Sequence, residues 1–180
     1  MTDLDLSTLP ADAEELILDF ERFAACFWTI STKSQGIQPF RLTKAQKLIW
    51  REFKRQMDKQ GYVRLNILKC RQVGGSSFVR AMAHHYVMTH PGVAALSIAH
   101  DQALPTEWLV QCKRNWDEMP SWRPKREPAE GHIIRYDNDS RYGIGSAQGG
   151  FPGMGHTIQF LHLSEIGRWD KPPISMTPQP

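Results

Sequence analysis

Residues 66–77 read NILKCRQVGGSS, and this stretch decides the fold that the sequence predicts. The apolar run from Tyr62 to Leu68 has the composition of a β-strand, a Gly-Gly turn follows it, and a helix is expected to open at Ser76. A strand, a glycine turn and a helix N-terminus in this order direct backbone N–H groups at an anion. The stretch therefore predicts a cradle for phosphate groups.

The cradle departs from the usual phosphate-loop motif G-x-x-x-x-G-K-[ST]. Cys70 stands at the first glycine position, Gly75 at the lysine position and Ser76 at the hydroxyl position. Lys69 and Arg71 flank the turn and are the candidates for the missing cation. An ordinary connection between a strand and a helix is the alternative interpretation of the turn.

A second element is the hydrophobic segment 158–163, which ends in Ser164-Glu165. Nucleotide hydrolysis needs a carboxylate at the tip of a strand that neighbours the loop, where it orients the attacking water. Glu165 fits this place, and Ser164 stands where an aspartate would hold Mg²⁺. The alternative is that Glu165 only favours a helix N-terminus.

A third element lies upstream of the loop. A glutamine amide can pair with the donor and acceptor edges of adenine, and Gln46 is the candidate for this role. Phe40 is the candidate aromatic side chain for packing against the adenine ring. The alternative for Gln46 is a solvent-facing position on a helix.

The remaining chain alternates between helical and strand patterns. Helices are expected over residues 11–33, 43–59, 78–88 and 103–118. Strands are expected over residues 62–68, 93–99 and 157–163, with a hairpin of residues 132–136 and 141–146. In the second helix, the side chains expected to face inward are Leu48, Ile49, Phe53 and Met57. This alternation predicts an α/β fold with a mainly parallel sheet.

Length and charge narrow the class of protein. A chain of 180 residues suits one α/β domain. Three distant cysteines form no disulfide framework or metal motif, and no apolar run is long enough to span a bilayer. The first 21 residues carry seven acidic side chains and no Lys or Arg, so the remaining chain holds 22 basic against 12 acidic side chains. A basic body suits a phosphate-rich partner, although a solvated helix face is the simpler reading of the charge alone.

The three elements together resemble the ATPase portion of the large terminase subunit, the DNA-packaging motor of tailed bacteriophages. The resemblance covers about residues 36–170 and rests on PFRL with Gln46, LKCRQVGGSS at 68–77, SIAH at 97–100, GSA at 145–147 and LHLSE at 161–165. Terminases are known for deviant phosphate loops with an Arg-Gln pair before the glycine, which Arg71-Gln72 match. Several branches also carry serine at the metal-binding aspartate, as at Ser164.

The resemblance implies a P-loop NTPase fold of the RecA/ASCE type, with ATP and Mg²⁺ as cofactors. It implies that Gln46 reads adenine, that Ser76, Ser164 and Glu165 form the metal site, and that Glu165 and Arg71 act in catalysis. The phosphate-binding residues that it implies are Lys69, Arg71, Gln72, Val73, Gly74, Gly75, Ser76 and Ser77.

The resemblance also implies an organisation and a set of partners. Residues 1–35 form an N-terminal helical segment, residues 36–170 the ATPase domain, and residues 171–180 a Pro-rich tail. Large subunits continue into a nuclease domain, and the chain stops fifteen residues after Glu165, so a truncated N-terminal portion is expected. The implied partners are double-stranded DNA, the portal protein, the small terminase subunit and further copies in a ring, with no membrane. The implied location is the cytoplasm of a bacterial host.

Two other functions remain open at this point. Another P-loop translocase, such as a helicase, shares the adenine-reading glutamine and the paired motifs. A truncated fragment that binds nucleotide or DNA without turnover is the second alternative, because the loop lysine and the metal aspartate are both absent.

Overall fold

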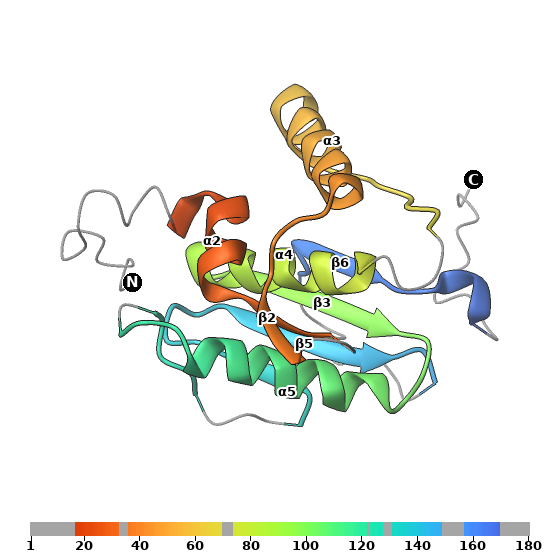
Figure 1. Cartoon of the computed structure of the whole chain (residues 1–180). Coiled ribbons are helices and arrows are strands. Elements are labelled where there is room, and N and C mark those ends of the chain that lie inside the picture. The colour runs from red at the N-terminus through yellow and green to blue at the C-terminus, as the bar shows by residue number, and fades with distance from the viewer. Residues whose placement is uncertain are drawn as a thin grey trace.

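A mostly parallel sheet of four strands lies at the centre of the computed structural model, which describes residues 17–32, 36–69, 74–121, 123–127, 131–148 and 157–169 (Figure 1). The strands are β3 (Ala94–Ala99), β4 (Ile133–Arg135), β5 (Arg141–Ser146) and β6 (Phe160–Leu163). Their order is β4-β5-β3-β6, with β3 parallel to both β5 and β6 and with β4 antiparallel to β5. The predicted hairpin and the mainly parallel sheet are therefore confirmed.

Two helices cover one face of this sheet. They are α4 (Gly75–Thr89) and α5 (Leu104–Asp117). Ser97 Oγ lies 2.8 Å from Tyr142 Oη and 3.2 Å from His162 Nδ1, so these three side chains share a face. The ring of His84 from α4 lies near Tyr142, and the ring of Trp108 from α5 stacks on His162. Both helices therefore pack on the face that carries Ser97. Within the described ranges, no helix combines the length and apolar character that a bilayer crossing requires.

The N-terminal part is a short helix followed by a hairpin. The elements are α2 (Phe20–Phe27), β1 (Thr29–Thr32) and β2 (Gly36–Pro39). The helix predicted over residues 11–33 is thus wrong for residues 29–32, which form β1, and its residues 11–16 and 33 lie outside the described ranges. Asp19 caps α2 by accepting a hydrogen bond from the backbone N–H of Arg22, and Trp28 ends the helix. The β-branched residues that follow favour a strand, and β1 pairs antiparallel with β2.

Helix α3 (Lys44–Gln60) projects away from the sheet and the other helices (Figure 1). Thr43 and Gln46 form a capping box at its start, and Gly61 ends it with φ 74°, a conformation that favours glycine. The predicted helix is confirmed, but two of its expected inward positions are wrong, because Leu48 is 58% and Met57 45% exposed. The helix meets the core only along the stripe that contains its partly buried residues Ile49, Trp50 and Phe53.

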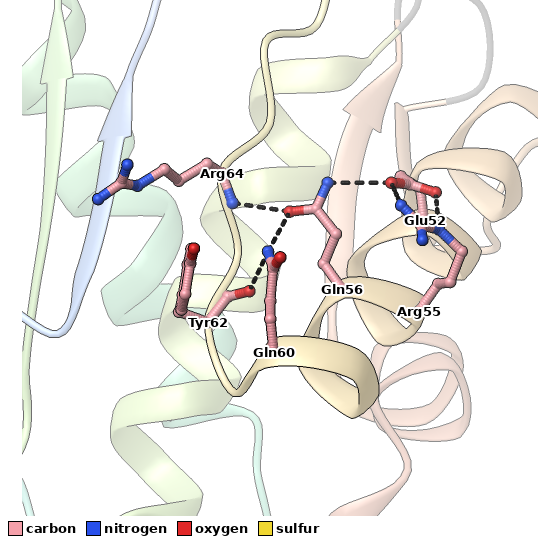
Figure 2. Close-up of polar contacts among 6 residues, drawn as sticks. All are labelled: Glu52, Arg55, Gln56, Gln60, Tyr62 and Arg64. Carbon is pink, nitrogen blue, oxygen red and sulfur yellow. Dashed lines mark hydrogen bonds and ion pairs between the residues drawn. The ribbon is translucent and has the colours of Figure 1, made fainter.

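Residues 63–69 form no strand, so the strand predicted over residues 62–68 is wrong. Figure 2 shows how the start of this segment is held at the end of α3. Gln60 Nε2 donates to the carbonyl of Tyr62 at 3.0 Å, and Gln56 Oε1 accepts from the backbone N–H of Arg64 at 2.8 Å. These side chains bind backbone groups that a neighbouring strand would otherwise bind. The segment therefore leaves α3 as an exposed extended chain, and Leu68 is fully exposed.

Three histidines are held neutral inside the fold. Burial lowers the pKa of His84 and of His162 to about 3, and burial lowers the pKa of His85 to about 4. His84 is fully buried and its Nε2 lies 2.8 Å from Tyr136 Oη. In the unfolded chain each imidazole regains its ordinary pKa of 6.5 and takes up a proton on acidification.

These lowered pKa values predict acid-induced loss of stability. The contribution of the neutral histidines is complete above pH 6.5 and is lost as the pH falls through about 4 for His85 and about 3 for His84 and His162, because the unfolded state binds more protons over this range. Each group contributes a slope of up to about 1.4 kcal/mol per pH unit. Urea unfolding at pH 7, 6 and 5 should show a shallower slope for His84→Gln than for the wild type. Equal slopes would contradict a neutral buried His84, whatever the absolute stability of the variant.

Candidate functional site

Helix α4 begins directly after a glycine in the left-handed conformation. Gly74 precedes the helix with φ 72°, the left-handed conformation that favours glycine. Within the described residues, the N-cap residue Gly74 makes no side-chain hydrogen bond to the first turn of α4. The helix runs for 15 residues, and its dipole places partial positive charge at the same end. The predicted helix is confirmed, and its N-terminus has the properties of an anion-binding end.

Lys69 lies directly over the first turn of α4. A Cβ built on Gly75 would come within 2.6 Å of Lys69 Cδ and 3.0 Å of Lys69 Cε. The absence of a side chain at Gly75 therefore leaves the space that the aliphatic stem of Lys69 occupies. The side chain of a lysine from the preceding segment therefore lies beside the first residue of α4, although position 75 itself carries no cation.

The hydroxyls of Ser76 and Ser164 meet at 3.0 Å. Ser76 stands in the first turn of α4, and Ser164 follows the last residue of β6. Ser164 is buried and fixed by its backbone, since its N–H donates to the carbonyl of Ile98 at 2.9 Å and its carbonyl accepts from Trp169 Nε1 at 3.0 Å. The structure thus brings together two predicted metal-site residues that are 88 positions apart.

Glu165 stands beside this hydroxyl pair in a strained conformation. Its φ of 56° and ψ of 43° lie in the left-handed region, which costs a non-glycine residue about 1–3 kcal/mol. Its Oε2 lies 2.9 Å from Arg168 Nη1 and 3.2 Å from His100 Nδ1. The hydrogen bond from Arg168 chiefly lowers the carboxyl pKa, and the charges of His100, Arg168 and Lys69 act in the same direction. Glu165 is therefore an ionised carboxylate with a third of its side chain exposed to solvent.

Gln46 belongs to the same neighbourhood, with its amide engaged by the protein itself. Its Oε1 accepts from the backbone N–H of Thr43 at 2.9 Å, and its Nε2 donates to the carbonyl of Gly74 at 3.1 Å. It is 2% exposed. The structure places Gln46 on the glycine turn, and adenine reading by this amide stays a prediction. Phe40 is buried in the core at 2% exposure, so its ring face is covered by protein in this arrangement.

Arg80 is a member of the site that the sequence interpretation missed. Its guanidinium is buried and donates to Ser77 Oγ, to Gln111 Oε1 and to the carbonyl of Ser76. It also lies 4.4 Å from the centre of the Trp108 ring, and in the described part of the chain it forms no ion pair with a carboxylate. The sequence signal that could have identified Arg80 is an arginine inside an otherwise apolar helical stretch, four residues after Ser76.

Several predicted residues lie outside the described ranges. These are Arg71, Gln72 and Val73 of the loop, together with Cys70. Their roles stay predictions from the sequence. The described part of the predicted phosphate-binding set consists of Lys69, Gly74, Gly75, Ser76 and Ser77.

The protein oxygen atoms near the start of α4 are too few to bind a hard cation unless a bound ligand supplies further oxygen atoms. Ser76 and Ser164 provide neutral hydroxyls, and Glu165 provides the nearest carboxylate along the chain. Among the described residues, no three His, Cys, Asp or Glu side chains gather into a metal site. Mg²⁺ commonly takes one or two protein oxygens and completes its octahedron with water and phosphate oxygens. The residues present therefore fit Mg²⁺ that is bound together with a phosphorylated ligand.

Comparison with protein-family models and with curated proteins finds no match to this chain. The class of protein consequently rests on the structure. The chain is a mixed α/β protein with a mostly parallel sheet flanked by helices, an architecture compatible with Rossmann-like and P-loop folds.

Proposed function

We propose that this chain is a Mg²⁺-dependent ATPase domain of the P-loop type, which acts as the N-terminal portion of a large terminase subunit and drives double-stranded DNA into a viral procapsid. The observation that carries the nucleotide half of the proposal is the 3.0 Å contact between Ser76 and Ser164, with Glu165 next in the chain. The hydroxyl pair joins the first turn of α4 to the end of β6, and in a phosphate-binding site these are the positions from which a hydroxyl and a nearby carboxylate act on the phosphates. The terminase half rests on the resemblance of the sequence motifs.

The residues of the candidate site divide between phosphate binding, metal binding, water activation and adenine binding. Lys69, Arg71 and the N–H groups of α4 neutralise the phosphates, and Gln72, Val73, Gly74 and Ser77 shape the loop around them. Ser76 and Ser164 would hold Mg²⁺, which would supply further neutralisation of the phosphate charge. Glu165 orients the attacking water and accepts its proton. Gln46 contacts adenine after exchanging its hydrogen bond to Gly74 for one to the base.

The proposed partners follow from the terminase half alone. They are double-stranded DNA, the portal protein, the small terminase subunit and further copies of the chain in a ring. The proposed site of action is the cytoplasm of a bacterial host. A helicase-like translocase would use the same nucleotide site with a different partner.

A second candidate function is nucleotide binding without turnover. It is favoured by the contact of Glu165 Oε2 with Arg168 Nη1 at 2.9 Å, which engages the carboxylate that hydrolysis requires. ATP binding with no release of phosphate by the wild-type chain would select this second function.

Replacement of Ser76 by alanine tests the nucleotide site. Titration calorimetry should show Mg²⁺-dependent binding of ATP by the wild type, and Ser76→Ala should lose roughly tenfold or more in affinity, since hydrogen bonds to charged groups contribute about 1.5–3 kcal/mol. The loss should disappear when both proteins are titrated in excess EDTA. Thr106→Ala is the matched control, because it removes an exposed hydroxyl from the first turn of α5. A wild-type chain that binds no ATP would refute the proposed function.

A further inference from the structure

Helix α3 carries an excess of basic side chains along an exposed side. Its 17 residues include two acidic and six basic side chains, the latter being Lys44, Lys47, Arg51, Lys54, Arg55 and Lys59. All six basic residues are exposed. At 100° per residue they fall within one arc of the helix, opposite the stripe that contains Ile49 and Phe53. We call these six residues the basic face of α3.

Of the two acidic residues in α3, Asp58 is exposed and lies within the arc of the basic face, so six basic side chains stand against one acidic side chain there, and Glu52 lies beside the face. Figure 2 shows Glu52 held by its helical neighbours, with two hydrogen bonds from Arg55 and one from Gln56. The hydrogen bond from Arg55 is the main reason that the pKa of Glu52 is lowered to about 2, so this acid is satisfied within the helix. Lys47 forms an ion pair with Glu21. Within the described residues, Lys44, Arg51, Lys54 and Lys59 form no ion pair.

The shape of α3 matches the charge. Figure 1 shows the helix standing away from the sheet, and its only fully buried side chain is that of Gln46 at its first turn. From Lys44 to Lys59 the basic face extends about 22 Å at 1.5 Å per residue. Duplex DNA presents one negative charge per roughly 1.7 Å of its axis, and its major groove of about 12 Å admits an α-helix. A projecting helix with a row of exposed cations is complementary to this polyanion.

We propose that the basic face of α3 binds the phosphate backbone of duplex DNA, with the helix lying along the major groove. The contact is independent of base sequence, because it is made by charge. The deep and narrow major groove of duplex RNA does not admit a helix, so DNA is the favoured occupant. The proposal rests on the proposed function for the biological role of the DNA, but the binding surface itself is argued from α3 alone.

Both ends of α3 are also connected to the candidate phosphate site. At its start, Gln46 donates a hydrogen bond to the carbonyl of Gly74. After its end, residues 63–69 lead to Lys69, whose side chain lies over Gly75. A DNA-binding helix α3 is therefore in direct contact with Gly74, which precedes α4, and is connected through Lys69 to Gly75, which begins α4.

The test is a DNA-binding measurement without nucleotide. Fluorescence anisotropy of a labelled 30-base-pair duplex should show binding by the wild-type chain, weakened by salt. Arg51→Ala/Lys59→Ala should lower the affinity roughly 30-fold at 0.1 M salt and should reduce the slope of log K against log salt by about 2. Lys113→Ala/Lys125→Ala, which has the same net charge and alters neither α3 nor the phosphate site, should behave as the wild type.

Several results would overturn the proposal. They are no binding of DNA by the wild type, an equal loss in the control variant, and equal affinity for a duplex RNA of the same length. ATP titration of the same proteins separates this proposal from the proposed function. Loss of DNA binding in Arg51→Ala/Lys59→Ala with intact ATP affinity supports both proposals. DNA binding through α3 by a chain that binds no ATP would refute only the nucleotide site.

Discussion

Glutamine in place of Glu165 is expected to abolish measurable ATP hydrolysis while leaving the affinity for MgATP close to that of the wild type. Glutamine has nearly the same shape as glutamate but cannot accept a proton from water. Loss of a general base typically lowers the rate by about 100- to 10,000-fold. The ionised state of Glu165, favoured mainly by Arg168, is the state that this role requires at neutral pH. Phosphate release under saturating MgATP measures the effect.

Asp101→Asn is the matched control for this experiment. Asp101 follows the C-terminal end of β3, is exposed, and accepts a hydrogen bond from the backbone N–H of Ala103. Its replacement removes a carboxylate near the same edge of the sheet without altering the proposed water position, so the rate should be unchanged. Equal rates for the wild type and Glu165→Gln would show that Glu165 does not act in hydrolysis.

Replacement of Lys69 by alanine is expected to lower the affinity for ATP by about 10- to 150-fold, which corresponds to the 1.5–3 kcal/mol of a charge-assisted hydrogen bond. The reason is geometric, because the side chain of Lys69 lies within 2.6 Å of the point where a Cβ on Gly75 would stand. The aliphatic stem of Lys69 thus lies beside the first residue of α4, which makes Lys69 the candidate to replace the missing loop lysine. Titration calorimetry with ATP and with adenosine separates phosphate contacts from base contacts, and only the ATP affinity should fall.

Two further variants decide between the candidate cations. Arg71→Ala should cause the smaller loss if Lys69 supplies the main charge, although Arg71 is the residue that the sequence motif favours. Gly75→Lys in the Lys69→Ala background should regain part of the affinity, since it returns the cation to its usual position in the loop. An unchanged ATP affinity in Lys69→Ala, combined with a large loss in Arg71→Ala, would assign the charge to Arg71.

Elements with strong local signals were predicted correctly from the sequence. Thr43 and Gly61 bracket α3, and a capping box and a glycine in the left-handed conformation are local features that need no tertiary contact. The buried strand β3 and the hairpin of β4 and β5 were also recognised, because continuous apolar runs and short polar turns are local patterns.

The failures arose where partners outside the segment decide the structure. The apolar run from Tyr62 to Leu68 has the composition of a strand. Its first backbone groups are instead hydrogen-bonded to the side chains of Gln56 and Gln60, and both Tyr62 and Leu68 are exposed. Leu48 and Met57 have helical spacing, but the body of the protein reaches α3 only along its other apolar stripe. An apolar pattern indicates which side chains would be stabilised by burial. Whether another part of the protein packs against those side chains depends on the tertiary structure.

The sequence by itself determined the helices α3, α4 and α5, the strands β3 to β6, the glycine turn before α4 and the identity of the polar residues at the ends of α4 and β6. Tertiary structure alone decided that the hydroxyls of Ser76 and Ser164 meet, because parallel strands and the helix beside them bring distant parts of the chain to one edge of the sheet. It also decided that Lys69 fills the space left by Gly75, and that Arg80 is buried against Ser77 and Gln111. Distances between side chains far apart in sequence depend on how the helices and strands pack, and local sequence patterns do not determine that packing.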